Sequence, residues 1–172
     1  MKKRSIILYC ILIILIGNCV YAADIGDGFS GLKWGTDRST VENLLKVSQK
    51  ENVGYFIKPD EVYIINHANV GQVFYGFYQN KFFAALFRIK DKEDFGKIKE
   101  YMISGYGTPR AQLRVNQTVY IWEYGDIKIK MKLYEKDGTH KLAYYYTPLY
   151  GKLNESRLEE NFEQSIKLVP KE

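Results

Sequence analysis

The sequence of 172 residues predicts an α+β fold, in which an antiparallel sheet packs with helices on one of its faces. Two observations lead to this prediction. Strand-like segments follow one another across connections too short for a crossover, so neighbouring strands run antiparallel. Helix-like segments begin at capping residues and repeat their apolar side chains every three or four positions. The order of helix, strands, helix, strands and helix indicates loosely duplicated units, each a helix followed by a meander.

The first 22 residues have the layout of a secretory signal peptide. A basic start at residues 2–4 precedes an apolar run over residues 6–16, and Val20-Tyr21-Ala22 supplies a signal-peptidase site. The apolar run is shorter than the roughly 20 residues of a membrane span. We therefore expect a leader over residues 1–22 and a single α+β domain over residues 23–172, exported to the periplasm or the medium and without a transmembrane segment.

Both cysteines, Cys10 and Cys19, lie in the leader, so the mature chain can form neither a disulfide nor a thiolate metal site. Ile16-Gly17-Asn18-Cys19 resembles a lipoprotein cleavage box, which leaves lipid anchoring through Cys19 as an alternative to cleavage after Ala22. The leader also carries three of the five net positive charges, which leaves two on the mature chain. This near balance predicts no binding of nucleic acid.

The first half of the mature chain begins with a predicted helix over residues 38–47. Asp37 can cap this helix by accepting free backbone amides. The apolar residues that recur at helical spacing are Val41, Leu44 and Leu45. Short β-prone segments follow at residues 54–58 and 62–66.

Two aromatic segments, residues 72–78 and 81–89, are joined by Gln79-Asn80 and predict a hairpin. Both segments are apolar on both faces. Strands of this kind lie where a sheet is covered on each side. We therefore place the hairpin in the middle of the sheet.

Two further helices are predicted, one after this hairpin and one near the end of the chain. Asp91 can cap the first, which ends at the glycines and proline of residues 105–109, and residues 110–117 are interpreted as a polar loop. Asn154 can cap the second. The side chains expected to face inward are Phe95, Ile98, Tyr101, Met102, Leu158, Phe162, Ile166 and Val169. Those expected to face water are Glu159, Glu160 and Glu163.

Three alternating strands are predicted at residues 118–124, 127–134 and 140–147. The turns Gly125-Asp126 and Asp137-Gly138 set their register. The resulting pairs are Tyr124 with Ile127, Trp122 with Ile129, Tyr120 with Met131, Leu133 with Leu142, Met131 with Tyr144, and Ile129 with Tyr146. Both turns place Trp122, Ile129 and Tyr144 on one face, which we assign to the core, because a slip of one residue would bury lysines instead.

The opposite face of these strands carries the candidate binding surface, in which lysines alternate with tyrosines. Its residues are Lys128, Lys130, Lys132, Tyr134, Lys141 and Tyr145. A basic strand face could bind another protein or an anionic envelope component, such as a polysaccharide or lipid headgroups. The alternative, which alternation alone favours, is a solvated outer face. In either case we expect Lys130 and Lys132 to point into water and to tolerate replacement by glutamate.

Two motifs resemble a known group of proteins. Gly31-Leu32-Lys33-Trp34-Gly35-Thr36 resembles the start of small secreted bacterial proteins and lipoproteins of unknown function, and Tyr106-Gly107-Thr108-Pro109 followed by Trp122 resembles their second half. The helix-then-meander unit is similar to the repeat of the SmpA/BamE outer-membrane assembly lipoproteins and of β-lactamase inhibitory protein. The resemblance implies a non-catalytic envelope or secreted domain. The chain departs from the assembly lipoproteins at Ser48-Gln49-Lys50, where they have a Gly-x-Pro exit.

Few residues suggest catalysis. His67 and His140 lie near predicted turns, outside any spaced metal motif, and are interpreted as polar turn residues. We predict no catalytic residue, no metal site and no cofactor. The leading hypothesis is an exported, non-catalytic binding module. The alternatives are a small hydrolase of cell-wall or carbohydrate substrates with paired carboxylates such as Asp60 and Glu61, and a protein inhibitor of a secreted enzyme.

Replacement of Ile129 by aspartate is expected to abolish folding, because it places a charge without a partner in the predicted core. Circular dichroism during heating measures this effect. A soluble variant that unfolds cooperatively would contradict the placement of Ile129.

Overall fold

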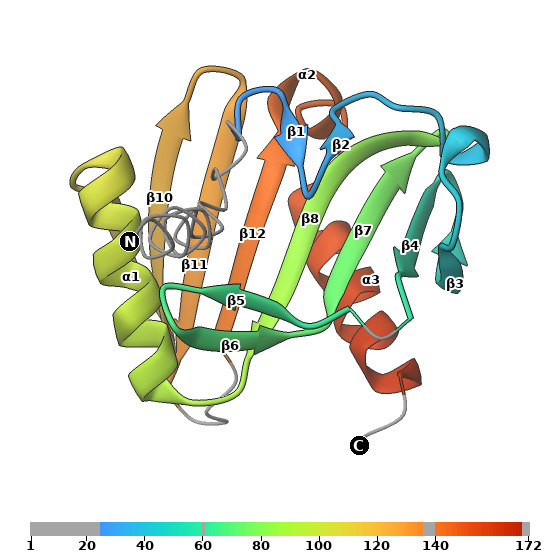
Figure 1. Cartoon of the computed structure of the whole chain (residues 1–172). Coiled ribbons are helices and arrows are strands. Elements are labelled where there is room, and N and C mark those ends of the chain that lie inside the picture. Colours follow the sequence, from blue (N-terminus) through green and yellow to red (C-terminus); the bar gives the residue numbers. More distant parts are fainter. Residues whose placement is uncertain (1–24, 60, 136–139, 170–172) are drawn as a thin grey trace, which may run out of the picture.

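The computed structural model of the chain describes residues 25–59, 61–135 and 140–169. The predicted leader with Cys10 and Cys19, Asp60 and the predicted Asp137-Gly138 turn lie outside the described residues. One antiparallel sheet of eight strands dominates the described part (Figure 1). This sheet and the few helices around it confirm an α+β architecture.

The strands of the sheet, in chain order, are β3 (Leu45–Lys50), β4 (Val53–Ile57), β7 (Val73–Tyr78), β8 (Lys81–Ile89), β9 (Arg110–Arg114), β10 (Gln117–Tyr124), β11 (Ile127–Tyr134) and β12 (His140–Tyr146). Across the sheet the order is β3-β4-β7-β8-β12-β11-β10-β9, with β3 at the right of Figure 1. The other elements are the hairpins β1 (Gly28–Phe29)–β2 (Leu32–Lys33) and β5 (Tyr63–Ile65)–β6 (Ala68–Gly71), the 3₁₀ turn η1 (Arg38–Thr40), and the helices α1 (Lys92–Tyr106), α2 (Thr147–Tyr150) and α3 (Glu155–Leu168).

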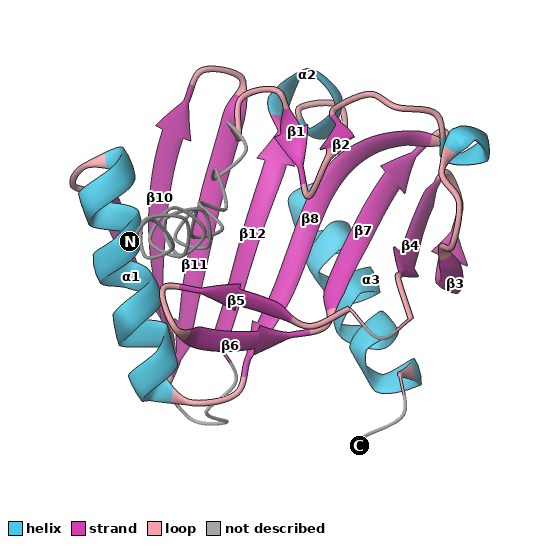
Figure 2. Ribbon diagram, in the orientation of Figure 1, coloured by secondary structure: helices cyan, strands magenta, loops and turns pink. Residues whose placement is uncertain are grey.

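Helices cover both faces of the sheet, so the prediction of helices on one face is wrong. α1 packs on one face, where the Tyr144 hydroxyl lies 3.8 Å from the Met102 sulfur. α3 packs on the other face, where the Phe162 ring lies 5.8 Å from that of Tyr55 and 5.2 Å from that of Phe74, between centroids. We call these the α1 face and the α3 face. Figure 2 shows α1 and the two small hairpins in front of the sheet and α3 behind it.

Both faces need cover because the central strands are apolar on both sides. β8 directs Phe82 and Phe87 to the α1 face, and Phe83 and Leu86 to the α3 face. All four side chains are almost fully buried. The prediction of a central hairpin is therefore confirmed, including its turn at Gln79-Asn80.

The register of the last three strands is confirmed in part. The Gly125-Asp126 turn pairs Trp122 with Ile129, as predicted. Between β11 and β12 the prediction is wrong by two residues, since Ile129 pairs with Tyr144 and Leu133 with His140. A shift of two residues keeps every side chain on its predicted face. Trp122, Ile129 and Tyr144 are accordingly all buried on the α1 face.

The predicted helix over residues 38–47 is wrong, because the chain forms only the short turn η1 before it extends into β3. The Arg38 guanidinium donates hydrogen bonds to the carbonyl oxygens of Val41 and Leu44, both at 2.9 Å. Asn43 adopts a left-handed backbone conformation, with φ of 57°, which interrupts a helix. The hydrogen bonds from the Arg38 side chain thus replace the backbone hydrogen bonds of the helix that the spacing of apolar residues had predicted.

The two long helices are confirmed at their caps. Asp91 accepts a hydrogen bond from the Asp94 amide at 2.9 Å, and Asn154 accepts one from the Arg157 amide at 3.2 Å. The inward placement of Tyr101 is wrong, since this side chain is exposed. It lies about 100° around the helix from its buried neighbour Met102, outside the apolar stripe.

Each long helix packs on strands from the other half of the chain. α1 follows β8 and packs on it and on β6, but it also reaches β10, where the Phe95 ring lies 6.2 Å from that of Tyr120, between centroids. α3 follows β12 but buries Phe162 against β4 and β7. Within the described residues no α-helix precedes β3, so the predicted order of a helix before the first strands is wrong.

Replacement of Phe162 by alanine is expected to cost about 3–5 kcal/mol of unfolding free energy, because the ring leaves a cavity against β4 and β7. Chemical denaturation measures the loss. Since α3 ties the two halves together, a single transition should persist in the variant. The matched control is Glu160→Ala on the exposed side of the same helix, which should change stability little, and separate transitions for the two halves would contradict the interlocked packing.

Candidate functional site

The candidate binding surface predicted from the lysine stripe lies mostly under α3. Lys130 and Lys132 are 5% exposed, and Lys141 is 7% exposed. The prediction that these side chains point into water is wrong. The assignment of polar and apolar residues to opposite faces of the strands is confirmed. The polar face, however, is buried between the sheet and α3.

A row of glutamates on α3 neutralises the buried lysines. Glu155, Glu159 and Glu163 are four residues apart, and this spacing places them on one side of the helix. Their respective partners are Lys130, Lys132 and Lys141. The Lys130 ammonium lies 2.7 Å from the Glu155 carboxylate and also donates to the Tyr150 hydroxyl at 2.7 Å. We call these three pairs the α3 ladder.

Electrostatics at the α3 ladder follow from its burial. Burial lowers the pKa of Lys130 and of Lys132, and the charge of Glu155 opposes both changes. Burial also acts to raise the pKa of Glu155, but the Lys130 ammonium and the Tyr150 hydroxyl outweigh it and lower the pKa. Since the three buried lysines pair with carboxylates on one side of α3, the ladder sets the position of this helix on the sheet.

Little space remains between α3 and the lysines. A cavity of about 20 Å³ lies there, lined by residues that include Lys130, Lys132 and Phe162. This volume holds about one water molecule. The arrangement therefore suits helix docking rather than the binding of a ligand.

The other residues of the predicted surface do not form a continuous patch. Tyr145 is buried and stacks on Tyr150, with ring centroids 4.3 Å apart. Tyr134 is half-buried and lies under the Lys141 ammonium, which is 4.9 Å from its ring centroid. Lys128 pairs with Glu123 at 3.9 Å, as the predicted register requires.

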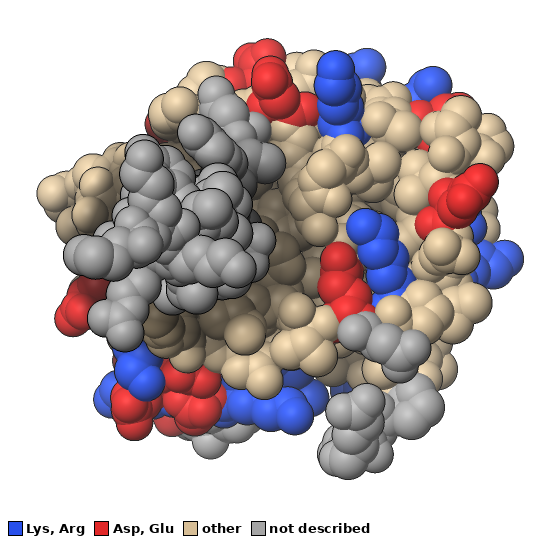
Figure 3. Space-filling view, in the orientation of Figure 1, with Lys and Arg blue, Asp and Glu red and all other residues tan. Residues whose placement is uncertain are grey.

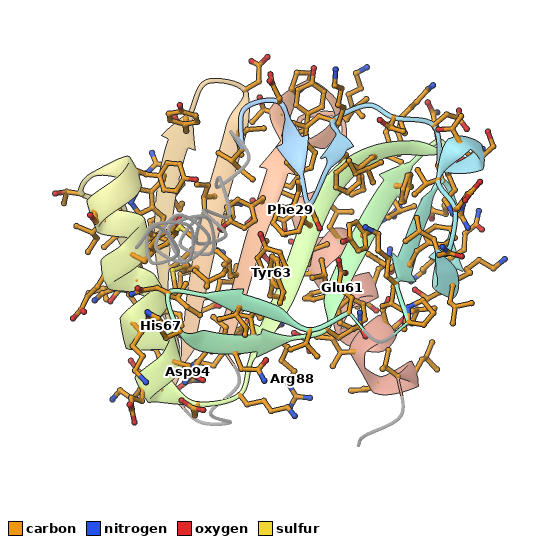
Figure 4. All side chains as sticks on the ribbon, in the orientation of Figure 1. Phe29, Glu61, Tyr63, His67, Arg88 and Asp94 are labelled. Carbon is orange, nitrogen blue, oxygen red and sulfur yellow. The ribbon has the colours of Figure 1, made fainter. Side chains whose placement is uncertain are left out.

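A hollow on the α1 face is the second location that could hold a ligand. Figure 3 shows this face hollowed between the two small hairpins, with charged side chains at its rim. Phe29 and Tyr63 point toward one another there, from β1 and β5 (Figure 4), with ring centroids 5.1 Å apart. Phe29 also packs on Phe87 and Tyr144. Except for Tyr63, these rings are buried, so they fill the floor of the hollow.

Glu61 lies beside this hollow (Figure 4) and joins three parts of the chain. Its carboxylate accepts the Tyr75 hydroxyl at 2.8 and 2.9 Å and the Ser30 hydroxyl at 3.4 Å, and the Lys58 ammonium lies 3.8 Å away. Burial, together with the neighbouring carboxylate, raises the pKa of Tyr75. Asp60, the carboxylate expected to act with Glu61, lies outside the described residues.

The two histidines differ from one another. His67 is exposed in the β5–β6 turn with φ of 63°, which confirms a turn residue. His140 is 3% exposed and its ring centroid lies 5.1 Å from that of Phe95, so its interpretation as a polar turn residue is wrong. The cause is that β12 begins at His140 and directs the imidazole against α1. Within the described residues, His, Cys, Asp and Glu side chains form no cluster of three that could hold a metal ion.

The feature that sequence reasoning missed is the edge strand β9. Residues 110–117 were expected to be a polar loop, but Arg110–Arg114 pairs with β10 over its whole length. Within β9 the Leu113 side chain is 85% exposed, and Val115, which follows the strand, is 88% exposed. The alternation of Arg110, Gln112 and Arg114 with Ala111 and Leu113 was the signal that predicts a strand.

Comparisons with known proteins identify no relative: no protein family, no curated protein and no solved structure matches the chain. The resemblance to small secreted proteins and assembly lipoproteins therefore rests on its short motifs alone. A helix long and apolar enough to cross a membrane is not found in the described part of the chain.

Replacement of Lys132 by glutamate is expected to cost about 2–4 kcal/mol of unfolding free energy, because it sets a second carboxylate against Glu159 in a mostly buried position. Thermal or chemical denaturation measures the loss. Combining it with Glu159→Lys should restore part of the stability. The control Lys128→Gln, at a partly exposed pair, should cost less than about 1 kcal/mol. Equal tolerance of both single variants would show that the α3 ladder contributes nothing.

Proposed function

We propose that this chain is an exported, non-catalytic binding module of the cell envelope or the medium, which contacts another protein through the β9 edge of its sheet. The leader pattern of residues 1–22 supports export. The observation that carries the proposal is β9, an open edge strand with exposed apolar residues beside it. Exposed edge strands are templates for pairing with another chain.

The faces of the sheet leave little room for a partner. The α3 face is covered by α3 and its ladder, and the α1 face is covered by α1 and the two hairpins. Within the described residues, the open edges of the eight-stranded sheet are β3 and β9, while the strands of the two small hairpins form separate sheets on the α1 face. A partner that reaches the sheet itself therefore pairs at an edge.

The two edges are not equivalent. β3 contains an irregular register between Lys46 and Ser48, and the Ser48 hydroxyl bonds to that of Ser165 on α3 at 2.5 Å. Bulges of this kind hinder the addition of another strand. β9 is regular over all five residues, and α3 does not cover it. The apolar Leu113 and Val115 give this edge a contact area that β3 shares only at Leu45.

The alternatives draw less support from the described residues. A hydrolase with paired carboxylates would use Glu61, but this carboxylate is held by Tyr75 and lies beside Lys58. An enzyme inhibitor would present the α1 face, but the aromatic rings at the floor of its hollow, such as Phe29 and Phe87, are buried. Neither Glu61 for hydrolysis nor the α1 face for inhibition is positioned as directly for its role as β9 is for pairing with another strand.

Site-specific photo-crosslinking in the native cells tests the proposal. A crosslinking residue placed at Leu113 should give discrete adducts with another protein, because this side chain would lie next to those of a strand that pairs with β9. The same residue at Leu168, which is similarly apolar and exposed at the end of α3, is the control and should give none. Equal or absent adducts at the two positions would contradict a binding role for this edge.

A further inference from the structure

We infer that the partner of β9 is an extended acidic segment of another protein, in which acidic and apolar side chains alternate and which adds one strand to the sheet. The inference rests on the proposed function, because it names the chemistry of the partner at the same edge. Three features of β9 support it: the direction of its free backbone groups, the sorting of its side chains between two faces, and its charge.

The register shows which backbone groups of β9 point outward. A two-residue turn closes the β9–β10 hairpin, and its closing pair is Arg114 with Gln117. Residues of a closing pair exchange hydrogen bonds with one another, and this role alternates along an antiparallel strand. Arg110, Gln112 and Arg114 therefore bond toward β10. Ala111 and Leu113 direct their amide and carbonyl groups away from the sheet, where another strand can pair with them.

The side chains of β9 sort by chemistry between the two faces. Arg110 and Arg114 lie in register with Ile121 and Gln117, on the α3 face, and Ala111 and Leu113 lie on the α1 face. An added strand places its own side chains beside these residues, one face at a time. Its favourable partners are acidic side chains beside the arginines and apolar side chains beside Ala111 and Leu113. Such a segment reads as alternating acidic and apolar residues.

The charge on this edge is not neutralised within the described residues. The ion pairs found there engage Lys130 and Lys132 with α3 but include neither Arg110 nor Arg114. Arg114 donates instead to the Gln112 amide oxygen at 3.3 Å. The positive charge of Arg114 lies close enough to the α3 ladder to contribute to the lowered pKa of Lys130. An incoming carboxylate would therefore meet a positive field at this edge.

The same charges argue against a second copy of this chain as the partner. Antiparallel pairing of two β9 strands about Gln112 sets Arg110 of one copy directly across from Arg114 of the other. Like charges in this position are destabilising. Pairing of β9 with β3 of another copy meets Lys46 and Lys50, which are also basic. The charges therefore favour a different, acidic chain.

Two synthetic peptides test the inference on the purified chain. In one, glutamate alternates with valine; in the other, lysine replaces glutamate. The glutamate peptide should bind and slow the hydrogen exchange of the Ala111 and Leu113 amides, and the lysine peptide should bind at least about tenfold more weakly. Comparable binding of the two peptides, or no protection of these amides, would overturn the inference.

Charge reversal provides the matched variants. Arg110→Glu combined with Arg114→Glu should weaken binding of the glutamate peptide by about tenfold and improve that of the lysine peptide. Lys46→Glu combined with Lys50→Glu, at the other edge, is the control and should change neither. Both pairs of side chains are exposed, so circular dichroism should show intact folds. If the control variant loses binding equally, the effect is one of net charge and the inference fails.

A proline variant tests the backbone pairing separately. Ala111→Pro removes an outward amide that the sheet itself does not use, and prolines are tolerated at such edge positions. Binding of the glutamate peptide should be lost while the fold persists. Self-association of the unmodified chain in sedimentation, in place of peptide binding, would identify a second copy as the occupant and overturn the inference. Adducts at Leu113 in cells together with failure of the peptide tests would leave the binding role standing and reject only the acidic partner.

Discussion

The structure depends on one constraint: its central strands are apolar on both sides. β7 and β8 direct aromatic side chains to each face, so a helix on one face alone would leave half of them in water. The chain meets this requirement with two helices, one for each face. The position of every lysine in the α3 ladder follows from this cover, because α3 extends over β12 and reaches β11.

Local signals in the sequence predicted the parts of the fold that depend on neighbours in the chain. The Gly125-Asp126 turn fixed the pairing of Trp122 with Ile129, and the caps Asp91 and Asn154 marked the start of two helices. The parts that failed depend on contacts that spacing does not encode. Arg38 captures two carbonyl groups that a helix would use, and β12 pairs with β11 in a register that differs by two residues from the predicted one.

The lysines of the candidate binding surface were predicted on the correct face of the sheet, but this face is covered by α3 and not open to water. Alternation along β11 identified Lys130 and Lys132 as sharing a face, but alternation cannot distinguish a wet face from one covered by a distant helix. The missing signal was present in α3, where Glu155, Glu159 and Glu163 repeat at the spacing of one helical face. Three lysines on the strands and three glutamates on one side of a helix predict that the two sets form ion pairs. This pairing also explains why both sets are tolerated at partly buried positions.

The packing of α3 has a consequence for biosynthesis. The surface that it covers includes β4 and β7, which precede α3 in the sequence and are therefore made before it. During synthesis, the rings of Tyr55 and Phe74 therefore stay uncovered until α3 has been made. A nascent chain that stalls before Asn154 would leave this apolar surface open to proteases and chaperones.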